Sequence, residues 1–495
     1  MSDGSAPVAA PSTPATTTGD TGDTGDTGDG TTAATTPQPT VDPFGWEAYG
    51  VDEVQAGSLE VPIDDADPSQ GSFTIYIARH LADPAKRIGS LLVNPGGPGF
   101  GGSDWAIYAD QLYSQDLLDH FDIVAWDPRG TGLTTPAIDC VDDYDPYFAV
   151  GDITPDDAAE SQQLVDLARE FEDLCVSKNA AIIQHIGTND SARDMDAIRR
   201  ALGEETISYF GFSYGSELGA TWATMFPETV RAAVLDGAVD PNADFLSGGL
   251  DQAKGFEDSI ARFLAECSGD DSCAFHSDGD AEAAFDSLML ALDAEPVPSS
   301  TSGRPYVNLG LALSAVAESM YSESSWPTLA QGLADARDGD GTILLELFDE
   351  YYQRQSDGTY DNSLEAFQTI SCMDQGVHLT IEEEDAAAAR YHEVAPRFSP
   401  NTRGTYMCTF YPDSDDPRIE VTGAGAGPIL VVGTTGDPAT PLASTERMAQ
   451  ALEGGVFVVV EANQHTGYGV NQCSYDVIDG YLIDLTVPEY GVRCA

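Results

Sequence analysis

The sequence has few basic residues, with 21 Lys and Arg against 83 Asp and Glu and a formal net charge of −62. Lysine occurs only at Lys86, Lys178 and Lys254. A surface of this sign repels nucleic acid and anionic lipid, so neither is expected as a partner. The surface also repels itself, and salt screens that repulsion. A saline habitat is one interpretation of the acidity, and the solubility of an exported protein is the other.

Long hydrophobic runs are also missing. No apolar run approaches the roughly 20 residues of a membrane-spanning helix, and the polar start of the chain contains no secretory signal peptide. Residues 1–43 are rich in Thr, Gly, Asp and Pro and repeat Thr-Gly-Asp over 18–29. They contain too few apolar side chains to fold, so we expect a disordered tether. A calcium-binding repeat is the alternative, although its spacing differs from that of known calcium loops.

Metal-ligating cysteine pairs are absent too. No C-x-x-C occurs, and no cysteine lies near His465 at ligand spacing, so we expect no metal site. The even count of eight cysteines indicates disulfides and a location outside the cytoplasm, with free buried thiols as the alternative. The simplest expectation is pairing in sequence order, as Cys140–Cys175, Cys267–Cys273, Cys372–Cys408 and Cys473–Cys494.

What the sequence does contain is a series of short apolar segments separated by helical patterns. Short buried strands suit a parallel sheet, and alternation with helices predicts an α/β fold. The segment 73–79 alternates apolar and polar residues, which is typical of a half-buried edge hairpin. The other expected strands are 88–93, 121–126, 207–212, 230–235, 429–432 and 456–460.

The pattern becomes mostly helical between residues 246 and 409 and then returns to strands. We therefore expect a core in two parts, 44–245 and 410–495, with a mainly helical cap formed by 246–409. Such an insertion would cover a site at the edge of the sheet.

One motif indicates the chemistry. Gly211-Phe-Ser-Tyr-Gly215 lies between a strand-like segment and a helix-like one. In that context G-x-S-x-G forms a nucleophile elbow, a strained turn that presents the serine hydroxyl at a helix N-terminus. Because the chain is rich in glycine, an ordinary Gly-rich turn is the alternative. Residues further along the chain must decide between the two.

An acyl-transferring serine needs a base and a group that orients the base. Asp437 directly follows the expected strand 429–432, and His465 directly follows the strand 456–460. Taken singly, each is an unremarkable loop residue. Their order along the chain, Ser, Asp and then His, is that of an α/β-hydrolase triad. The sequence thus predicts a serine hydrolase with Ser213, Asp437 and His465 as its catalytic residues.

The tetrahedral intermediate of this reaction also needs backbone N–H donors. The glycine-rich loop 94–103 follows the strand 88–93 and allows a substrate carbonyl to approach closely. We expect the amides of Gly97 and Tyr214 to form the oxyanion hole. A phosphate-binding loop is the alternative, but no G-K-[ST] follows, and the charge disfavours nucleotides.

Seven segments in fixed order carry a family resemblance over residues 70–495. They are Asn94-Pro-Gly-Gly-Pro-Gly99, Trp126-Asp-Pro-Arg-Gly-Thr-Gly132, Gly211-Phe-Ser-Tyr-Gly215, Val234-Leu-Asp-Gly-Ala-Val-Asp-Pro241, Ile370-Ser-Cys-Met-Asp374, Gly436-Asp-Pro-Ala-Thr-Pro441 and the tail from Cys473 to Cys494. Together they resemble the tripeptidyl aminopeptidases and related prolyl aminopeptidases of the α/β-hydrolase superfamily.

The resemblance implies an α/β-hydrolase fold, in which helices flank a mostly parallel central sheet, with a mainly helical cap. It further implies an exported, monomeric serine exopeptidase that cleaves peptides near a free N-terminus and needs no cofactor. It also supports the disulfides Cys372–Cys408 and Cys473–Cys494. The expected location is extracellular or periplasmic, with tethering or lipid anchoring through residues 1–43.

An exopeptidase must bind a free α-amine, which calls for carboxylates in the pocket. The candidates are Asp374 and Glu217. Relatives often carry an aromatic residue where this chain has Glu217, and a solvated or hydrogen-bonded helix Glu is the alternative there. Arg129, in the Asp-Pro-Arg-Gly turn, is expected to brace the structure rather than to catalyse.

Two other functions remain open at this stage. A carboxylesterase would use the same triad, because esters react readily at an activated serine. A non-catalytic binding protein would keep the fold without the chemistry.

Overall fold

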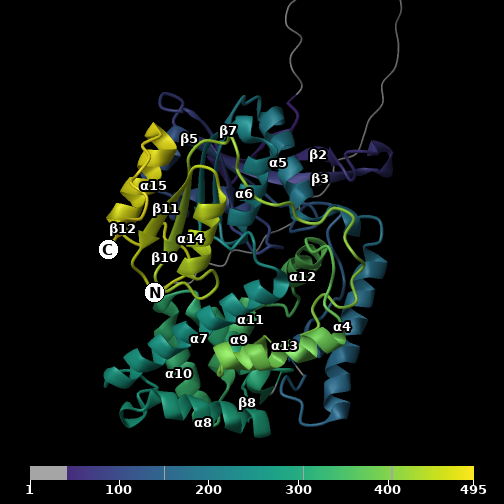
Figure 1. Ribbon diagram of the computed structural model, residues 1–495, viewed down its shortest axis with the longest axis vertical. Coiled ribbons are helices and arrows are strands. Elements are labelled where there is room, and N and C mark those ends of the chain that lie inside the picture. The colour runs from purple at the N-terminus through teal and green to yellow at the C-terminus, as the bar shows by residue number, and fades with distance from the viewer. Residues whose placement is uncertain (1–41, 150, 305, 403–404) are drawn as a thin grey trace, which may run out of the picture. The chain divides into compact units, whose positions relative to one another are not determined.

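A computed structural model describes residues 42–149, 151–304, 306–402 and 405–495 (Figure 1). The predicted tether, apart from Asp42 and Pro43, lies outside the described residues. The Thr-Gly-Asp repeat over 18–29 lies outside them as well.

In the described part of the chain, ten strands form one sheet in the order β1-β2-β3-β5-β4-β6-β7-β10-β11-β12. They are β1 (Glu47–Tyr49), β2 (Val51–Pro62), β3 (Ser72–His80), β4 (Gly89–Asn94), β5 (Phe121–Trp126), β6 (Ile207–Phe212), β7 (Val230–Asp236), β10 (Ile429–Thr434), β11 (Gly455–Val460) and β12 (Val492–Cys494). A separate pair consists of β8 (Val297–Pro298) and β9 (Tyr306–Val307).

The strands from β5 to β12 in that order run parallel, whereas β1, β2, β3 and β5 pair antiparallel. Every residue of β4, β5, β6 and β10 is buried, as expected for strands covered on both faces. The predicted hairpin at 73–79 is present as β2 and β3, but the outer strand is β1. The mostly parallel sheet with helices on both faces confirms the predicted fold class.

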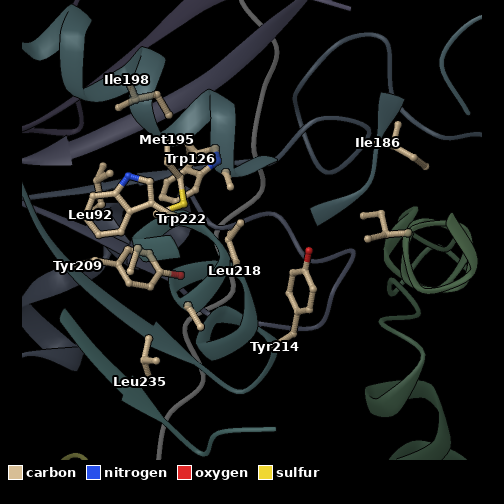
Figure 2. Packing of buried hydrophobic residues seen from close by; sticks show 14 of the residues in the cluster. Leu92, Trp126, Ile186, Met195, Ile198, Tyr209, Tyr214, Leu218, Trp222 and Leu235 are labelled. Atoms are coloured by element: carbon tan, nitrogen blue, oxygen red, sulfur yellow. The ribbon is translucent and has the colours of Figure 1, made fainter. Parts of the chain in front are cut away.

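Seven helices pack against the sheet in the described residues. They are α1 (Asp104–Ile107), α2 (Ala109–Leu112), α3 (Gln115–His120), α5 (Thr188–Leu202), α6 (Tyr214–Met225), α14 (Leu442–Ala451) and α15 (Gln472–Asp484). Side chains alternate across the sheet, so consecutive residues of β4 enter different cores. Leu92 belongs to a buried cluster that includes residues of α5, α6 and α14, whereas Leu91 and Val93 belong to one that includes residues of α2, α3 and α15. Figure 2 shows the first of these clusters, in which Met195 and Trp222 lie near Trp126.

The chain between β7 and β10 forms a helical segment with a hydrophobic core of its own. Its helices are α7 (Phe245–Gly269), α8 (Ala281–Ala294), α9 (Leu309–Met320), α10 (Trp326–Arg337), α11 (Thr342–Tyr351), α12 (Ser363–Met373) and α13 (Ile381–Val394). Figure 1 shows most of them gathered on one side of the sheet. One helix differs: α12 places Ala366, Ile370 and Met373 in the core shared with the sheet. Outside the segment, α4 (Ala158–Lys178) adds Phe171 to that same core.

Four disulfides join the eight cysteines in sequence order, as predicted: Cys140–Cys175, Cys267–Cys273, Cys372–Cys408 and Cys473–Cys494. Cys372–Cys408 attaches α12 to the strand-free stretch before β10, and Cys473–Cys494 attaches α15 to β12. Four such bonds indicate an oxidising compartment outside the cytoplasm. None of the helices described is both long enough and apolar enough to cross a membrane.

Arg129 is buried at the turn after β5, with only 1% of its surface exposed. Its guanidinium makes a bidentate pair with Asp194 of α5, at 2.7 and 2.6 Å. It also donates to the carbonyl oxygens of Ile63, at 3.1 Å, and His185, at 2.8 Å. The side chain thereby ties together three segments, which agrees with the structural role expected for it.

We predict that Arg129→Met lowers the free energy of unfolding by about 3–5 kcal/mol, because it leaves the Asp194 carboxylate buried without its partner. Arg200→Met is the matched control, since Arg200 is mostly exposed in its pair with Asp196 and should contribute little. Urea unfolding followed by circular dichroism measures both. Equal losses in the two variants would contradict the structural role of Arg129.

Candidate active site

Ser213 occupies a strained turn between β6 and α6. Its φ of 55° and ψ of −125° lie in a region that side chains other than glycine rarely adopt. A Cβ atom on Gly211 would lie 2.2 Å from the Gly215 carbonyl oxygen, so only glycine permits this close strand–helix approach. The Ser213 amide donates to the Asp236 carbonyl oxygen at 2.8 Å. This is the geometry of a nucleophile elbow.

His465 and Asp437 meet beyond the ends of β11 and β10. His465 Nδ1 lies 2.9 Å from both carboxylate oxygens of Asp437. Asp437 also accepts hydrogen bonds from the amides of Ala439, at 3.0 Å, and Thr440, at 2.8 Å, and from the Thr440 hydroxyl at 3.0 Å. The carboxylate is therefore fixed in a direction that orients the imidazole.

The other ring nitrogen, His465 Nε2, is buried and has no hydrogen-bond partner within the described residues. It is free to exchange a proton with a hydroxyl. Gly237 leaves room beside the ring, since a Cβ atom there would lie 2.9 Å from His465 Cε1. On the side of the helical segment, Tyr321 accepts a hydrogen bond from the His465 amide at 2.9 Å, and the two rings meet edge to face at 5.5 Å.

Burial and two nearby carboxylates together set the pKa of His465. Burial alone lowers the pKa of the imidazole, but Asp437 and, more weakly, Asp236 outweigh burial and raise the pKa above its ordinary value. Asp236 is fully buried and accepts hydrogen bonds from the amides of Gly467, at 2.7 Å, and Tyr468, at 2.8 Å. Burial raises the pKa of Asp236 itself to about 7.

The glycine-rich loop after β4 lies against the nucleophile. Gly96 and Gly97 have φ angles of 105° and 108°. A Cβ atom on Gly96 would lie 2.8 Å from Ser213 Cβ and 3.2 Å from the Tyr214 amide nitrogen. Within the described residues, neither the Gly97 nor the Tyr214 amide has a hydrogen-bond acceptor. Both predicted oxyanion donors are thus unpaired, and their segments meet beside Ser213.

Asp127, at the end of β5, holds this loop in place. Its carboxylate accepts from the amides of Ser103 and Leu133, both at 2.8 Å. A Cβ atom on Gly101 would lie 3.0 Å from the same carboxylate. The loop is therefore anchored at its far end by a buried acid.

A cavity of about 550 Å³ lies close to the predicted triad, although Ser213, Asp437 and His465 are not themselves among the residues that line it. Pro98, Tyr214 and Thr440, which are chain neighbours of the predicted catalytic and oxyanion residues, form one part of its wall. Helices α4, α7, α12 and α13 also contribute to its wall, together with several loops. No group of His, Cys, Asp and Glu able to hold a metal ion occurs among the residues that the structure describes.

Both predicted amine-binding carboxylates line this cavity, but both have partners in the protein. Glu217 forms an ion pair with Arg418. Asp374 accepts from the Thr188 amide at 2.7 Å and from the Thr188 hydroxyl at 2.6 Å. The Thr188 hydroxyl also lies 2.5 Å from the Tyr214 hydroxyl, so Asp374 is the end of a chain of hydrogen bonds leading to α6.

The sequence reasoning missed Asp236, Thr440 and Arg418. Asp236 and Thr440 both lie within the segments that carried the family resemblance, Asp236 directly after the expected strand 230–235, and that position was the available signal. Arg418 follows the helical segment in a stretch without periodicity, so nothing in the sequence pointed to its contact with Glu217.

Comparisons with known proteins show the family to which the chain belongs. The family model described as alpha/beta hydrolase fold matches residues 89–471. "Serine protease Hip1" of Mycobacterium tuberculosis is 34% identical over 463 residues, covering 88% of this chain and 86% of that protein. "Carboxylesterase B" of the same organism is 32% identical over 457 residues, covering 89% of this chain and 86% of that protein. "Tripeptidyl aminopeptidase" of Streptomyces coelicolor is 28% identical over 467 residues, covering 91% and 85%.

These matches span nearly all of the described residues and confirm the predicted resemblance. The chain belongs to the alpha/beta hydrolase family, and within it to the serine hydrolases that include the Hip1 protease, the carboxylesterase and the tripeptidyl aminopeptidases.

Proposed function

We propose that the chain is an exported serine exopeptidase that hydrolyses peptide bonds near free N-termini, with Ser213, His465 and Asp437 as its triad. The observation that carries the proposal is a strained elbow at Ser213 and a hydrogen-bonded His465–Asp437 pair, with Asp236 binding both the elbow and the loop that carries His465. We regard the helical segment, residues 246–409, as the cap. The relatives named as protease and tripeptidyl aminopeptidase support a peptide substrate.

In the proposed reaction, Ser213 Oγ attacks the substrate carbonyl carbon while His465 Nε2 takes the hydroxyl proton. The carbonyl oxygen becomes an oxyanion, which the amides of Gly97 and Tyr214 bind. Asp437 stabilises the resulting imidazolium through Nδ1. His465 then gives the proton to the leaving amine, and the C–N bond breaks.

The acyl-enzyme that remains is an ester of Ser213. His465 removes a proton from water, whose oxygen attacks the acyl carbon, and the proton passes to Ser213 Oγ as the ester bond breaks. The N-terminal peptide leaves as a carboxylate and restores the enzyme. No step requires a cofactor.

A carboxylesterase is the second candidate, favoured by the relative of that name at 32% identity. The same triad hydrolyses both kinds of bond. The two functions differ in whether the acyl group must carry a free amine.

We predict that the wild type hydrolyses tripeptide amides with a free N-terminus but not their N-acetylated forms, because an exopeptidase site must bind the free α-ammonium, which acetylation removes. Ser213→Ala should reduce turnover by about 10⁶-fold, as loss of a triad serine removes nucleophilic catalysis. Turnover of fluorogenic amides and of a nitrophenyl ester is measured for the wild type and for Ser213→Ala. Turnover of the ester with none of any amide would contradict the exopeptidase and favour the carboxylesterase.

We also predict that kcat/KM falls as the pH is lowered through a pKa above 6.5, because protonated His465 cannot act as a base. Asp236→Asn removes one carboxylate that stabilises the imidazolium, so the acid limb of the profile should move to lower pH. Asp479→Asn is a suitable control, since Asp479 is a partly buried acid that contacts Tyr468 instead. An unchanged limb in Asp236→Asn would contradict the electrostatic role of Asp236.

A further inference from the structure

The cavity beside the triad is rich in acids and almost free of bases. Arg418 is the one basic residue among the described residues that line it, and it is paired with Glu217. Six carboxylates share the lining: Glu217, Asp240, Asp244, Asp251, Asp374 and Glu384. A volume of about 550 Å³ lies within the usual range for small-ligand sites. The lining therefore favours a substrate group of positive charge.

Five of the six carboxylates have donors inside the protein. Glu217 has Arg418, Asp240 and Asp251 have Arg447, Asp244 has Ser247, and Asp374 has Thr188. These interactions fix the acids as parts of the wall. Each of these five acids thus already has at least one donor before a substrate enters.

Glu384 is the exception. Within the described residues its carboxylate has no hydrogen bond and no ion pair, although only 6% of the residue is exposed. It lies in the first turn of α13 on the same face as Ala387 and Tyr391, which are also buried. This is a position where an amphipathic helix ordinarily places an apolar side chain.

A buried carboxylate without a donor is costly, and native proteins seldom keep one without a reason. Burial raises the pKa of Glu384 to about 7, and neighbouring Asp385 adds to the effect. The Glu384 oxygens are accessible from the cavity, so a ligand there can supply the donor that the protein does not.

The chemistry of that ligand is restricted. The other five lining carboxylates already have partners, one remaining carboxylate cannot by itself bind a metal ion, and no metal-binding group occurs among the described residues. A primary ammonium supplies three N–H donors and a positive charge in a volume that the cavity accommodates. An ammonium is also the group that distinguishes a peptide N-terminus from the interior of a chain.

We propose that Glu384 binds the primary ammonium of the substrate, namely the α-ammonium of the peptide N-terminus, inside the active-site cavity. The inference rests on the proposed exopeptidase function and replaces Asp374 and Glu217 as the amine-binding groups. The distance along the cavity from Ser213 to Glu384 then sets how many residues are released. A lysine side chain carries the same chemical group, and the test separates the two sources.

The test measures binding rather than turnover, in the background of Ser213→Ala. Calorimetry gives the Kd of trialanine amide, of its N-acetylated form, and of N-acetylated tripeptide amides that carry one lysine. Glu384→Gln should raise the Kd of trialanine amide by roughly 10- to 100-fold, the usual effect of losing a hydrogen bond to a charged group. The acetylated peptide without lysine should bind with an unchanged Kd.

Glu382→Gln is the matched control, because Glu382 lies in the same turn of α13 but is exposed, and it should change neither Kd. Glu384→Asp keeps the charge with a shorter reach, so it should preserve a preference for the free amine even if the Gln variant folds poorly. Thermal unfolding verifies the fold of each variant.

Three results would overturn the inference. They are an unchanged Kd for trialanine amide in Glu384→Gln, an equal loss for the free and acetylated peptides, and a loss confined to the acetylated lysine peptides. The last would assign Glu384 to a lysine side chain instead. The turnover of amides by the wild type is measured separately, so a failure of the exopeptidase proposal is distinguishable from a failure at Glu384.

Discussion

One buried residue connects the parts of this active site. Asp236, at the carboxyl end of β7, accepts the Ser213 amide with its backbone oxygen and the amides of Gly467 and Tyr468 with its carboxylate. Asp236 thus binds both the elbow and the loop that carries His465. Because β6, β7, β10 and β11 are parallel neighbours, their ends meet at the same edge, and a residue at the end of β7 reaches both loops.

Much of this arrangement could be predicted from the sequence, because each predicted catalytic residue directly follows an apolar strand. The order Ser213, Asp437, His465 and the glycines around the elbow depend on local chain geometry, which sequence patterns express well. The sequence did not predict two strands, β12 and β2, that depend on contacts with residues elsewhere in the chain. β12 is three residues long and is joined to α15 by Cys473–Cys494, and β2 contains Gly57, where a Cβ atom would lie 2.6 Å from the Phe44 carbonyl oxygen.

The roles of acids in the cavity could not be predicted in the same way. Glu384 stands in the run Glu382-Glu-Glu-Asp385, which alone indicates a solvated helix surface. Only the packing of α13 shows that one of these four residues faces inward with Ala387. Likewise, Asp374 was expected to meet substrate, yet its oxygens are occupied by Thr188. Which acid is paired depends on residues far away in the chain, and periodicity carries no information about them.

The central claim is that Ser213 is an activated nucleophile. Treatment with a fluorophosphonate followed by intact-mass measurement and peptide mapping tests it most directly, because the reagent forms a covalent bond only with a serine that a base activates. The account predicts one adduct per chain, on Ser213, and its loss in His465→Ala. An unlabelled protein, or an adduct on another serine, would contradict it.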